Sequence, residues 1–235
     1  MVGGSISIGI ALAENTITND VGAYTENAKI TTTDSGDVEI QAIENATIDS
    51  TAATATIAAS FSIGFSLSGG GAEANSTIAT TTKAYVDQGD LNLSGDLTVD
   101  SVSTATANSD ASVISVSASL FGIAASGSVA KVDISSTTEA YATPSSIEAN
   151  DINVTAQTTP KAYGKAGGIS GGTSYAAGIS KADITVNPTV KAYAGGDITA
   201  NSLNIQAELI LPSSGEAATA DVMASSGALE VVSGT

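Results

Sequence analysis

Residues 37–42 read Asp-Val-Glu-Ile-Gln-Ala, a hexamer in which aliphatic and polar side chains alternate. Equivalent hexamers recur at residues 96–101 (Asp-Leu-Thr-Val-Asp-Ser), 151–156 (Asp-Ile-Asn-Val-Thr-Ala) and 202–207 (Ser-Leu-Asn-Ile-Gln-Ala). An alternation with a period of two places the aliphatic side chains on one face of a β-strand. Four copies in the same chain predict a protein built from one repeated β unit.

Each hexamer follows an Ala-Tyr pair, and other aliphatic residues recur at nearly constant spacings from that pair. The tyrosines, Tyr24, Tyr85, Tyr141 and Tyr193, are 61, 56 and 52 residues apart. An isoleucine comes seven residues before the first three tyrosines (Ile17, Ile78 and Ile134) and nine before the fourth (Ile184). Another aliphatic residue comes six residues after the first three (Ile30, Leu91 and Ile147) and five after the last (Ile198). We interpret the shrinking spacing as loops of variable length on a constant scaffold.

Three longer stretches with strict alternation also predict strands. Their apolar rows are Ile6, Ile8, Ile10 and Leu12; Phe61, Ile63, Phe65 and Leu67; and Ile114, Val116, Ala118 and Leu120. We expect these rows to point inward and to form continuous ladders, while small residues occupy the other face.

The predicted fold is all-β, a right-handed parallel β-solenoid (β-helix) made of four degenerate repeats. Residues 1–235 form a single elongated array with approximate units 5–60, 61–118, 119–170 and 171–235. A solenoid coil of roughly 20 residues predicts about three coils per unit, about twelve in all, and a rod of roughly 55 Å. An array of antiparallel β-sandwich units is the alternative.

The charge of the chain argues against several classes of partner. The formal net charge is −17, and all seven basic residues are lysines. Phosphate backbones and anionic lipid surfaces are bound by clustered lysine and arginine, so we expect neither nucleic acid nor an anionic membrane as a partner. No run of about 18 apolar residues occurs, so membrane insertion is not expected either.

The residue types needed for common catalytic and metal sites are missing. There is no histidine and no cysteine, which removes the most frequent general base, the Ser-His and Cys-His systems and the usual zinc ligands. The acidic residues are scattered. We therefore expect no enzymatic activity, no catalytic residues, no metal ligands and no cofactor.

Aspartates at glycine-containing turns suggest a calcium alternative, through Asp37, Asp96, Asp151 and Asp197. Calcium requires six to eight oxygen ligands that converge on one point. An aspartate beside a turn glycine more often accepts hydrogen bonds from the backbone, and this is the interpretation we adopt.

The repeated tyrosines allow two interpretations. Aromatic rings spaced along a rod could stack against a carbohydrate polymer. A residue at a fixed position in each repeat more often packs at a corner with its hydroxyl group hydrogen-bonded, and we expect this structural role.

Together, the alternating strands, the Ala-Tyr pairs and the Gly-Asp-aliphatic hexamers resemble the repeats of giant bacterial surface proteins, the filamentous-haemagglutinin-like and leukotoxin-like filamentous adhesins. The resemblance implies an extracellular or cell-surface protein. It also implies a structural, non-catalytic shaft of an adhesin or exoprotein, whose partners are neighbouring repeats, copies of itself end to end, or host and cell-surface glycans. Because residues 5–24 match the approach to the later tyrosines, we interpret the chain as a segment of a longer protein. A self-assembling subunit of an extracellular filament is the alternative function, followed by a carbohydrate-binding β-helix.

Overall fold

The computed structural model describes residues 3–60, 64–213, 215 and 217–228. Thirteen strands run through this part of the chain, and they form four successive coils. The first three coils have three strands each: β1 (Gly4–Ile17), β2 (Asp20–Thr31) and β3 (Val38–Ala59); β4 (Phe65–Ile78), β5 (Thr81–Asn92) and β6 (Leu97–Ala118); and β7 (Phe121–Ile134), β8 (Thr137–Thr143) and β9 (Ser146–Gly172). The fourth coil contains β10 (Tyr175–Val186), β11 (Thr189–Ala194), β12 (Asp197–Leu209) and β13 (Ala218–Ala228).

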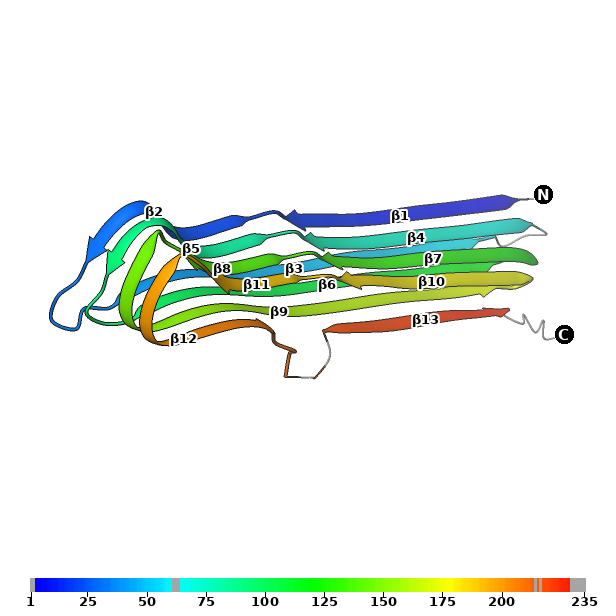
Figure 1. The fold of residues 1–235 in the computed structure, drawn as a ribbon. Helices are drawn as coiled ribbons and strands as arrows, with labels where there is room; N and C mark the ends of the chain where they lie inside the picture. Colours follow the sequence, from blue (N-terminus) through cyan, green and yellow to red (C-terminus); the bar gives the residue numbers. More distant parts are fainter. Residues whose placement is uncertain (1–2, 61–63, 214, 216, 229–235) are drawn as a thin grey trace.

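These strands form a parallel β-solenoid with two layers (Figure 1). One sheet has four strands in the order β1-β4-β7-β10, and the other has nine strands, with β3, β6 and β9 along its length. Every pairing between described strands is parallel. The prediction of an all-β parallel solenoid is therefore confirmed, and the antiparallel alternative is wrong.

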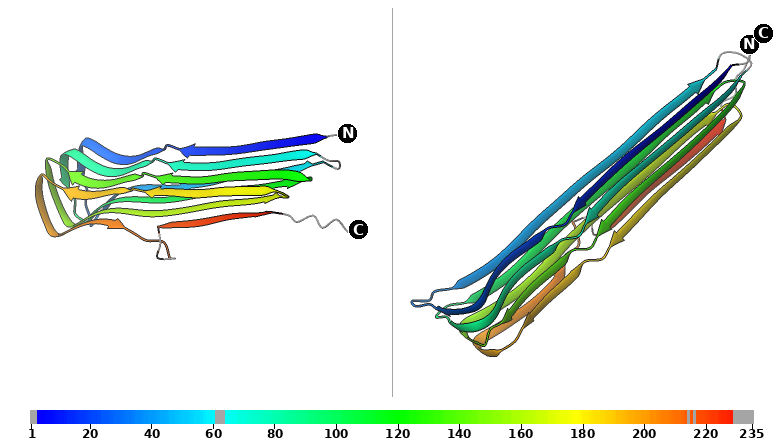
Figure 2. Two further views of the ribbon diagram at one scale, coloured as in Figure 1. Left: turned by 90° about the vertical axis from the view of Figure 1, so that its right-hand side faces the viewer. Right: turned by 90° about the horizontal axis from the view of Figure 1, so that it is seen from above.

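Each sequence repeat makes one coil, so the prediction of about twelve short coils is wrong. Tyr24 pairs with Tyr85, and Tyr141 pairs with both Tyr85 and Tyr193, so that consecutive repeats are direct neighbours. The reason is strand length: β3 and β6 contain 22 residues each, and β9 contains 27. At about 3.3 Å per residue and about 4.8 Å between strands, such a strand is about 70 Å long, whereas four coils stack to only about 19 Å. The molecule is thus a broad slab whose long axis follows the strands (Figure 2).

The register largely follows the alignment read from the sequence, with one correction. Ile17, Ile78 and Ile134 stand side by side, but their neighbour in the fourth coil is Val186, not Ile184. Most of the shortening of the repeats occurs at the turns after β3, β6 and β9. There the offset in register falls from 59 residues (Ala59 with Ala118) to 56 (Phe65 with Phe121), and from 55 (Ser117 with Gly172) to 52 (Ile123 with Tyr175). The corner before the hexamers contributes the rest. The segment between strands covers residues 32–37 in the first coil and 93–96 in the second, whereas β9 continues through the corner without a break.

Aliphatic ladders fill the interior in one half of the slab, where the hexamers lie. Leu97, Val99, Ile152 and Val154 are fully buried there, as are Ile78 and Ile134 at the other corner. Leu91 and Ile147 extend this cluster toward the turn. Here the hydrophobic side chains of successive coils stack inward, as the sequence predicted.

In the other half of the slab the pattern is reversed, and the expectation of inward aliphatic rows is wrong. Ile6, Ile8, Ile10 and Leu12 point outward and are 68–75% exposed. Phe65, Ile114 and Leu120, from the other two alternating stretches, are exposed as well, whereas Phe61 and Ile63 lie outside the described residues. The cause is strand continuity. Ile17 is held inside the core, so alternation along β1 forces every even-numbered residue before it outward.

Small and hydroxyl-bearing side chains occupy the interior of this second half. Ser66 contacts Ser117 at 2.6 Å and Ser119 at 2.7 Å, all three hydroxyl groups being buried between the two sheets. Similar contacts join Ser68 to Thr56, Ser76 to Ser50, and Ser170 to Ser126. Hydrogen bonding satisfies these buried hydroxyl groups, and their small size lets the sheets approach closely.

The two ends of the described chain lie at the same end of the slab, where β1 begins and β13 ends (Figures 1 and 2). The described residues form no helix, and therefore none that is long and apolar enough to span a membrane.

Candidate functional site

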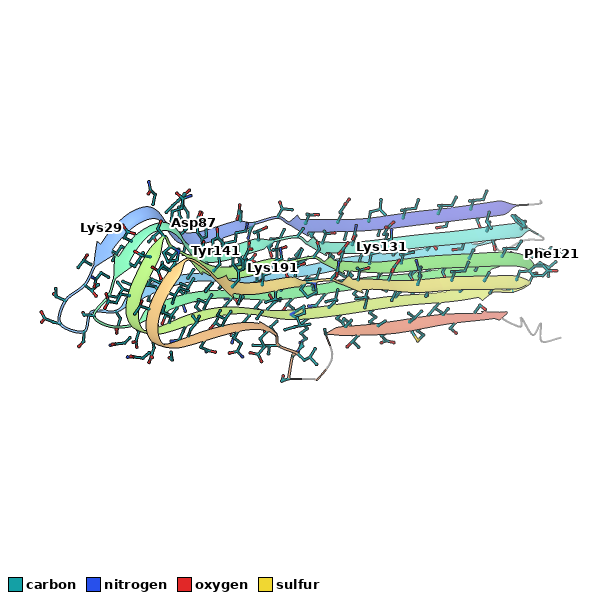
Figure 3. All side chains as sticks on the ribbon, viewed as in Figure 1. Lys29, Asp87, Phe121, Lys131, Tyr141 and Lys191 are labelled. Atoms are coloured by element: carbon teal, nitrogen blue, oxygen red, sulfur yellow. The ribbon has the colours of Figure 1, made fainter. Side chains whose placement is uncertain are left out.

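The repeated tyrosines form a stacked ladder on the outer surface of β2, β5, β8 and β11, one ring from each coil. The ring centroids of successive tyrosines are 4.9, 4.7 and 4.8 Å apart, and the ring planes differ by 4–7°. The ladder arises because parallel, in-register strands place the same residue of each coil at the same height. Tyr141, in the third coil, is labelled in Figure 3.

The ladder is a surface feature. Tyr24 is 58% exposed and Tyr193 is 41% exposed, while Tyr85 and Tyr141 between them are half-buried. The expected packing in a corner is therefore replaced by packing of the rings on one another. Since the rings use their faces for this contact, only the outer faces of Tyr24 and Tyr193 are open within the described chain, and a sugar polymer would meet mainly ring edges.

Charged residues line both sides of the ladder. On one side Lys83 forms an ion pair with Glu139 at 3.3 Å. On the other side Thr143 donates a hydrogen bond to Asp87 at 2.9 Å. These contacts join neighbouring coils, so they add to the register that the rings impose.

The phenol groups of Tyr85, Tyr141 and Tyr193 have raised pKa values and ionise less readily than free tyrosine. Burial is the main cause that raises the pKa of Tyr141 to about 12, with further contributions from Tyr193, Tyr85 and the carboxylates of Asp87 and Glu139. Burial also raises the pKa of Tyr85 and of Tyr193, and Tyr193 additionally donates a hydrogen bond to Glu139. All three rings are neutral near neutral pH.

We expect alkaline pH to destabilise the ladder. The pKa of Tyr141 is raised in the folded state from 10.0 to about 12, so its contribution to stability is intact below pH 10.0 and is lost as the pH rises to about 12. The absorbance of tyrosinate at 295 nm should still be rising near pH 12 in the folded protein, and it should level off earlier in urea. The Tyr141→Phe variant keeps the ring stack and should lose the latest part of this titration. Complete ionisation of the folded protein by about pH 11 would contradict the assignment.

Aspartates at the start of the hexamers form a second ladder. The backbone N–H of Asp96 donates to Oδ1 of Asp37 at 2.8 Å, and the backbone N–H of Asp151 donates to Oδ1 of Asp96 at 3.1 Å. In the fourth coil the Ser202 hydroxyl group donates to Oδ1 of Asp151 at 2.7 Å. Asp197 lies elsewhere, in register with Ser146. Three of the four turn aspartates therefore accept hydrogen bonds from the next coil.

Removal of one rung should weaken the corner by a modest amount. We expect Asp96→Ala to lower the free energy of unfolding by about 1 kcal/mol, because the N–H of Asp151 loses its acceptor. Asp96→Asn keeps an oxygen at the acceptor position and should be nearly neutral. Urea denaturation measures both variants. If millimolar calcium raised the midpoint of the wild type and not of Asp96→Ala, the carboxylates would be metal ligands instead.

A polar groove of ≈ 400 Å³ lies beyond the tyrosine ladder, over the ends of β2 and β5 and the adjoining parts of β9 and β12. Its charged lining residues are Lys29, Asp90, Glu148 and Asp197. Ser146 donates a hydrogen bond to Asp90 at 2.9 Å across the groove floor. The sequence did not indicate this groove, because the register of the coils alone brings these residues together.

No cluster of three or more potential metal-binding side chains occurs among the described residues. Glu44 is the most deeply buried carboxylate among them, 4% exposed, and its Oε2 accepts hydrogen bonds from Thr82 at 3.1 Å and Ser103 at 3.3 Å. These two bonds join the first coil to the second, and Oε1 of the same carboxylate is buried without a hydrogen-bond partner among the described residues.

Comparison with family models, curated proteins and solved structures finds no match to this chain.

Proposed function

We propose that the chain is a structural, non-catalytic segment of an extracellular bacterial adhesin or exoprotein, and that it serves as a broad and stiff ribbon. The observation that supports this proposal best is the strict register of the four coils. Identical side chains meet in the tyrosine ladder, and in the aspartate ladder the carboxylates of Asp37 and Asp96 accept hydrogen bonds from the backbone of the equivalent aspartate in the next coil. Such ladders resist sliding of one coil on the next, because a shift by one residue turns inward side chains outward.

The dimensions of the coil make the proposed shaft segment wide and short. A repeat of 52–61 residues adds only about 4.8 Å along the stacking direction, so these coils gain length slowly. They gain width instead, since each coil is about 70 Å across. A wide ribbon with two faces is better suited to lateral contacts and to resisting bending than to holding the end of an adhesin far from the cell.

Open coil edges favour the filament subunit as the second candidate. Among the described strands, β1 pairs only with β4 and β3 pairs only with β6, so each leaves one edge unpaired. At the opposite side, β10 pairs only with β7 in this part of the chain. Unpaired parallel edges are templates for another coil, from the same chain or from a second copy.

The mass of the endogenous polypeptide distinguishes the two candidates. An antibody raised against the chain would detect the product after denaturing separation, and labelling of intact cells would report its location. The ribbon segment predicts a surface-exposed polypeptide on the order of hundreds of kilodaltons. A surface product near 22.9 kDa favours the filament subunit, and a product that is inaccessible on intact cells contradicts both candidates.

A further inference from the structure

Among the residues that the structure describes, one half of the slab carries no charged side chain. Residues 3–13, 50–72, 111–130, 166–180 and 222–228 contain neither an acidic residue nor a lysine, although the chain has a net charge of −17. These residues are the ends of strands from all four coils, and they lie together at the end of the slab where Phe121 is labelled (Figure 3). Two copies that approach at this end meet little electrostatic repulsion, whereas contact elsewhere brings acidic surfaces together.

On the four-stranded sheet the uncharged half has a ridge. Ile6, Ile8, Ile10 and Leu12 project from β1, each at least 68% exposed. Monomeric proteins rarely expose so regular a row of large aliphatic side chains, which commonly marks an interface.

A shallow trough runs beside the ridge. The residues of β4 and β7 in register with Ile8 and Ile10 are Gly69, Gly71, Ala125 and Gly127. A Cβ atom added to any of these three glycines would meet no atom within 4 Å, so their outer side is open. Ile179 of β10, 75% exposed, borders the trough on the far side.

We propose that this face pairs with the same face of a second copy, so that the ridge of each copy fills the trough of the other. A two-fold axis parallel to the strands produces this arrangement, because it turns the first strand of one copy toward the middle strands of its partner. The interface is isologous and closes at two copies. It is separate from the stacking of coils through their edges.

Charge and area agree with a second copy as the occupant. The axis places Glu14 of each copy above the pair Asn75 and Lys131 of the other, since these three residues share one row of the sheet. Lys131, which already pairs with Glu73 of its own chain at 2.8 Å, thereby lies beside a second carboxylate, twice by symmetry. With β1 of one copy over β4 and β7 of the other, β10 lies outside the overlap, and the three remaining strands over the length of Gly4–Leu12 offer a face of about 14 by 30 Å. Two such faces bury on the order of 800 Å², which corresponds to a weak, concentration-dependent dimer.

A lipid surface is the less favourable occupant. Insertion of this half into hydrocarbon would carry the unpaired edge of β1 into a medium without hydrogen-bond partners. A fluid lipid surface, moreover, does not need a ridge that matches a trough, because a flat apolar face would bind lipid equally well.

Sedimentation velocity over a range of concentrations tests the pairing with the wild-type chain and two double variants. The ridge variant carries Ile8→Ala and Ile10→Ala, and the trough variant carries Gly71→Ile and Gly127→Ile. Both sets point outward, so circular dichroism should show folded chains. We expect each variant alone to dimerise at least about tenfold more weakly than the wild type. An equal mixture of the two should recover dimers, because the intact ridge of the trough variant fits the open trough of the ridge variant.

The trough variant is the decisive one, since it makes the face more apolar while it removes the fit. Stronger association of this variant would overturn the proposal in favour of unspecific hydrophobic contact. A wild-type chain that remains monomeric up to about 0.5 mM would also overturn it. So would growth beyond two copies that neither double variant changes, as coil-edge stacking predicts. Vesicles of phosphatidylcholine provide the last arm: equal binding of all three chains to vesicles, without dimers in solution, would assign the face to lipid.

Discussion

Replacement of Ile134 by alanine is expected to lower the free energy of unfolding by about 2–5 kcal/mol. Ile134 is fully buried in the third coil, between Ile78 of the second coil and Val186 of the fourth. Neighbours on both sides are fixed by the backbone ladder, so they cannot collapse into the space that the shorter side chain leaves. The loss therefore combines the transfer free energy of the missing methyl and methylene groups with the cost of a cavity.

The matched control is Ile57→Ala. Ile57 also lies within a long strand, β3, but its side chain points outward and is 70% exposed. We expect a change within about 0.5 kcal/mol for this variant, measured by urea denaturation at a low protein concentration. Similar losses for the two variants would show that the phase of alternation assigned to these strands is wrong.

Replacement of Gly70 by valine should destabilise the uncharged half by about 1–3 kcal/mol or more. Gly70 faces the interior, and a Cβ atom there would come within 2.6 Å of the Cγ1 atom of Val113 and 2.7 Å of the Oγ atom of Ser115. Both neighbours are held between the two sheets, and the Ser115 hydroxyl group also contacts Thr56 at 3.0 Å. The added side chain must push the sheets apart or break this contact.

Gly71→Val, at the next residue, is the control for this prediction. Its Cβ would meet nothing within 4 Å, and valine favours extended backbone more than glycine does, so we expect an unchanged or slightly higher stability. Thermal unfolding of the two variants, which have the same composition, isolates the effect of facing inward when the protein concentration is low enough to keep both chains monomeric. Equal stability of the two would contradict the close approach of the sheets.

Several features followed from the sequence alone. The four hexamers and the four Ala-Tyr pairs indicated a repeated β unit, because alternation with a period of two specifies strands whatever their neighbours are. The equal offsets of Ile30, Leu91 and Ile147 from their tyrosines anticipated the observed register. Of the candidate sites, the turn aspartates Asp37 and Asp96 accept backbone N–H groups, as interpreted from the sequence, but the donors lie in the next coil and not in the same turn. Asp151 accepts the side-chain hydroxyl group of Ser202 instead.

The tertiary structure decided the size of the coil. Local patterns mark where strands are, but only the pairing of each repeat with the next shows that one circuit uses all 52–61 residues. The polar groove around Asp90 and Glu148 depends on the same pairing, because its residues are distant in sequence and meet only across coils.

The tertiary structure also decided which face of each strand points inward. In β1, local hydrophobicity would bury Ile6, Ile8 and Ile10, yet alternation from the buried side of Ile17 turns all three outward. The same rule, applied from Ile134 in β7, turns Phe121 outward. The physical reason is that a continuous strand has one phase along its whole length. The buried aliphatic ladders of the four coils fix that phase in one half of the slab. In the other half the same phase turns glycine and serine side chains inward, and their small size allows the two sheets to lie close together.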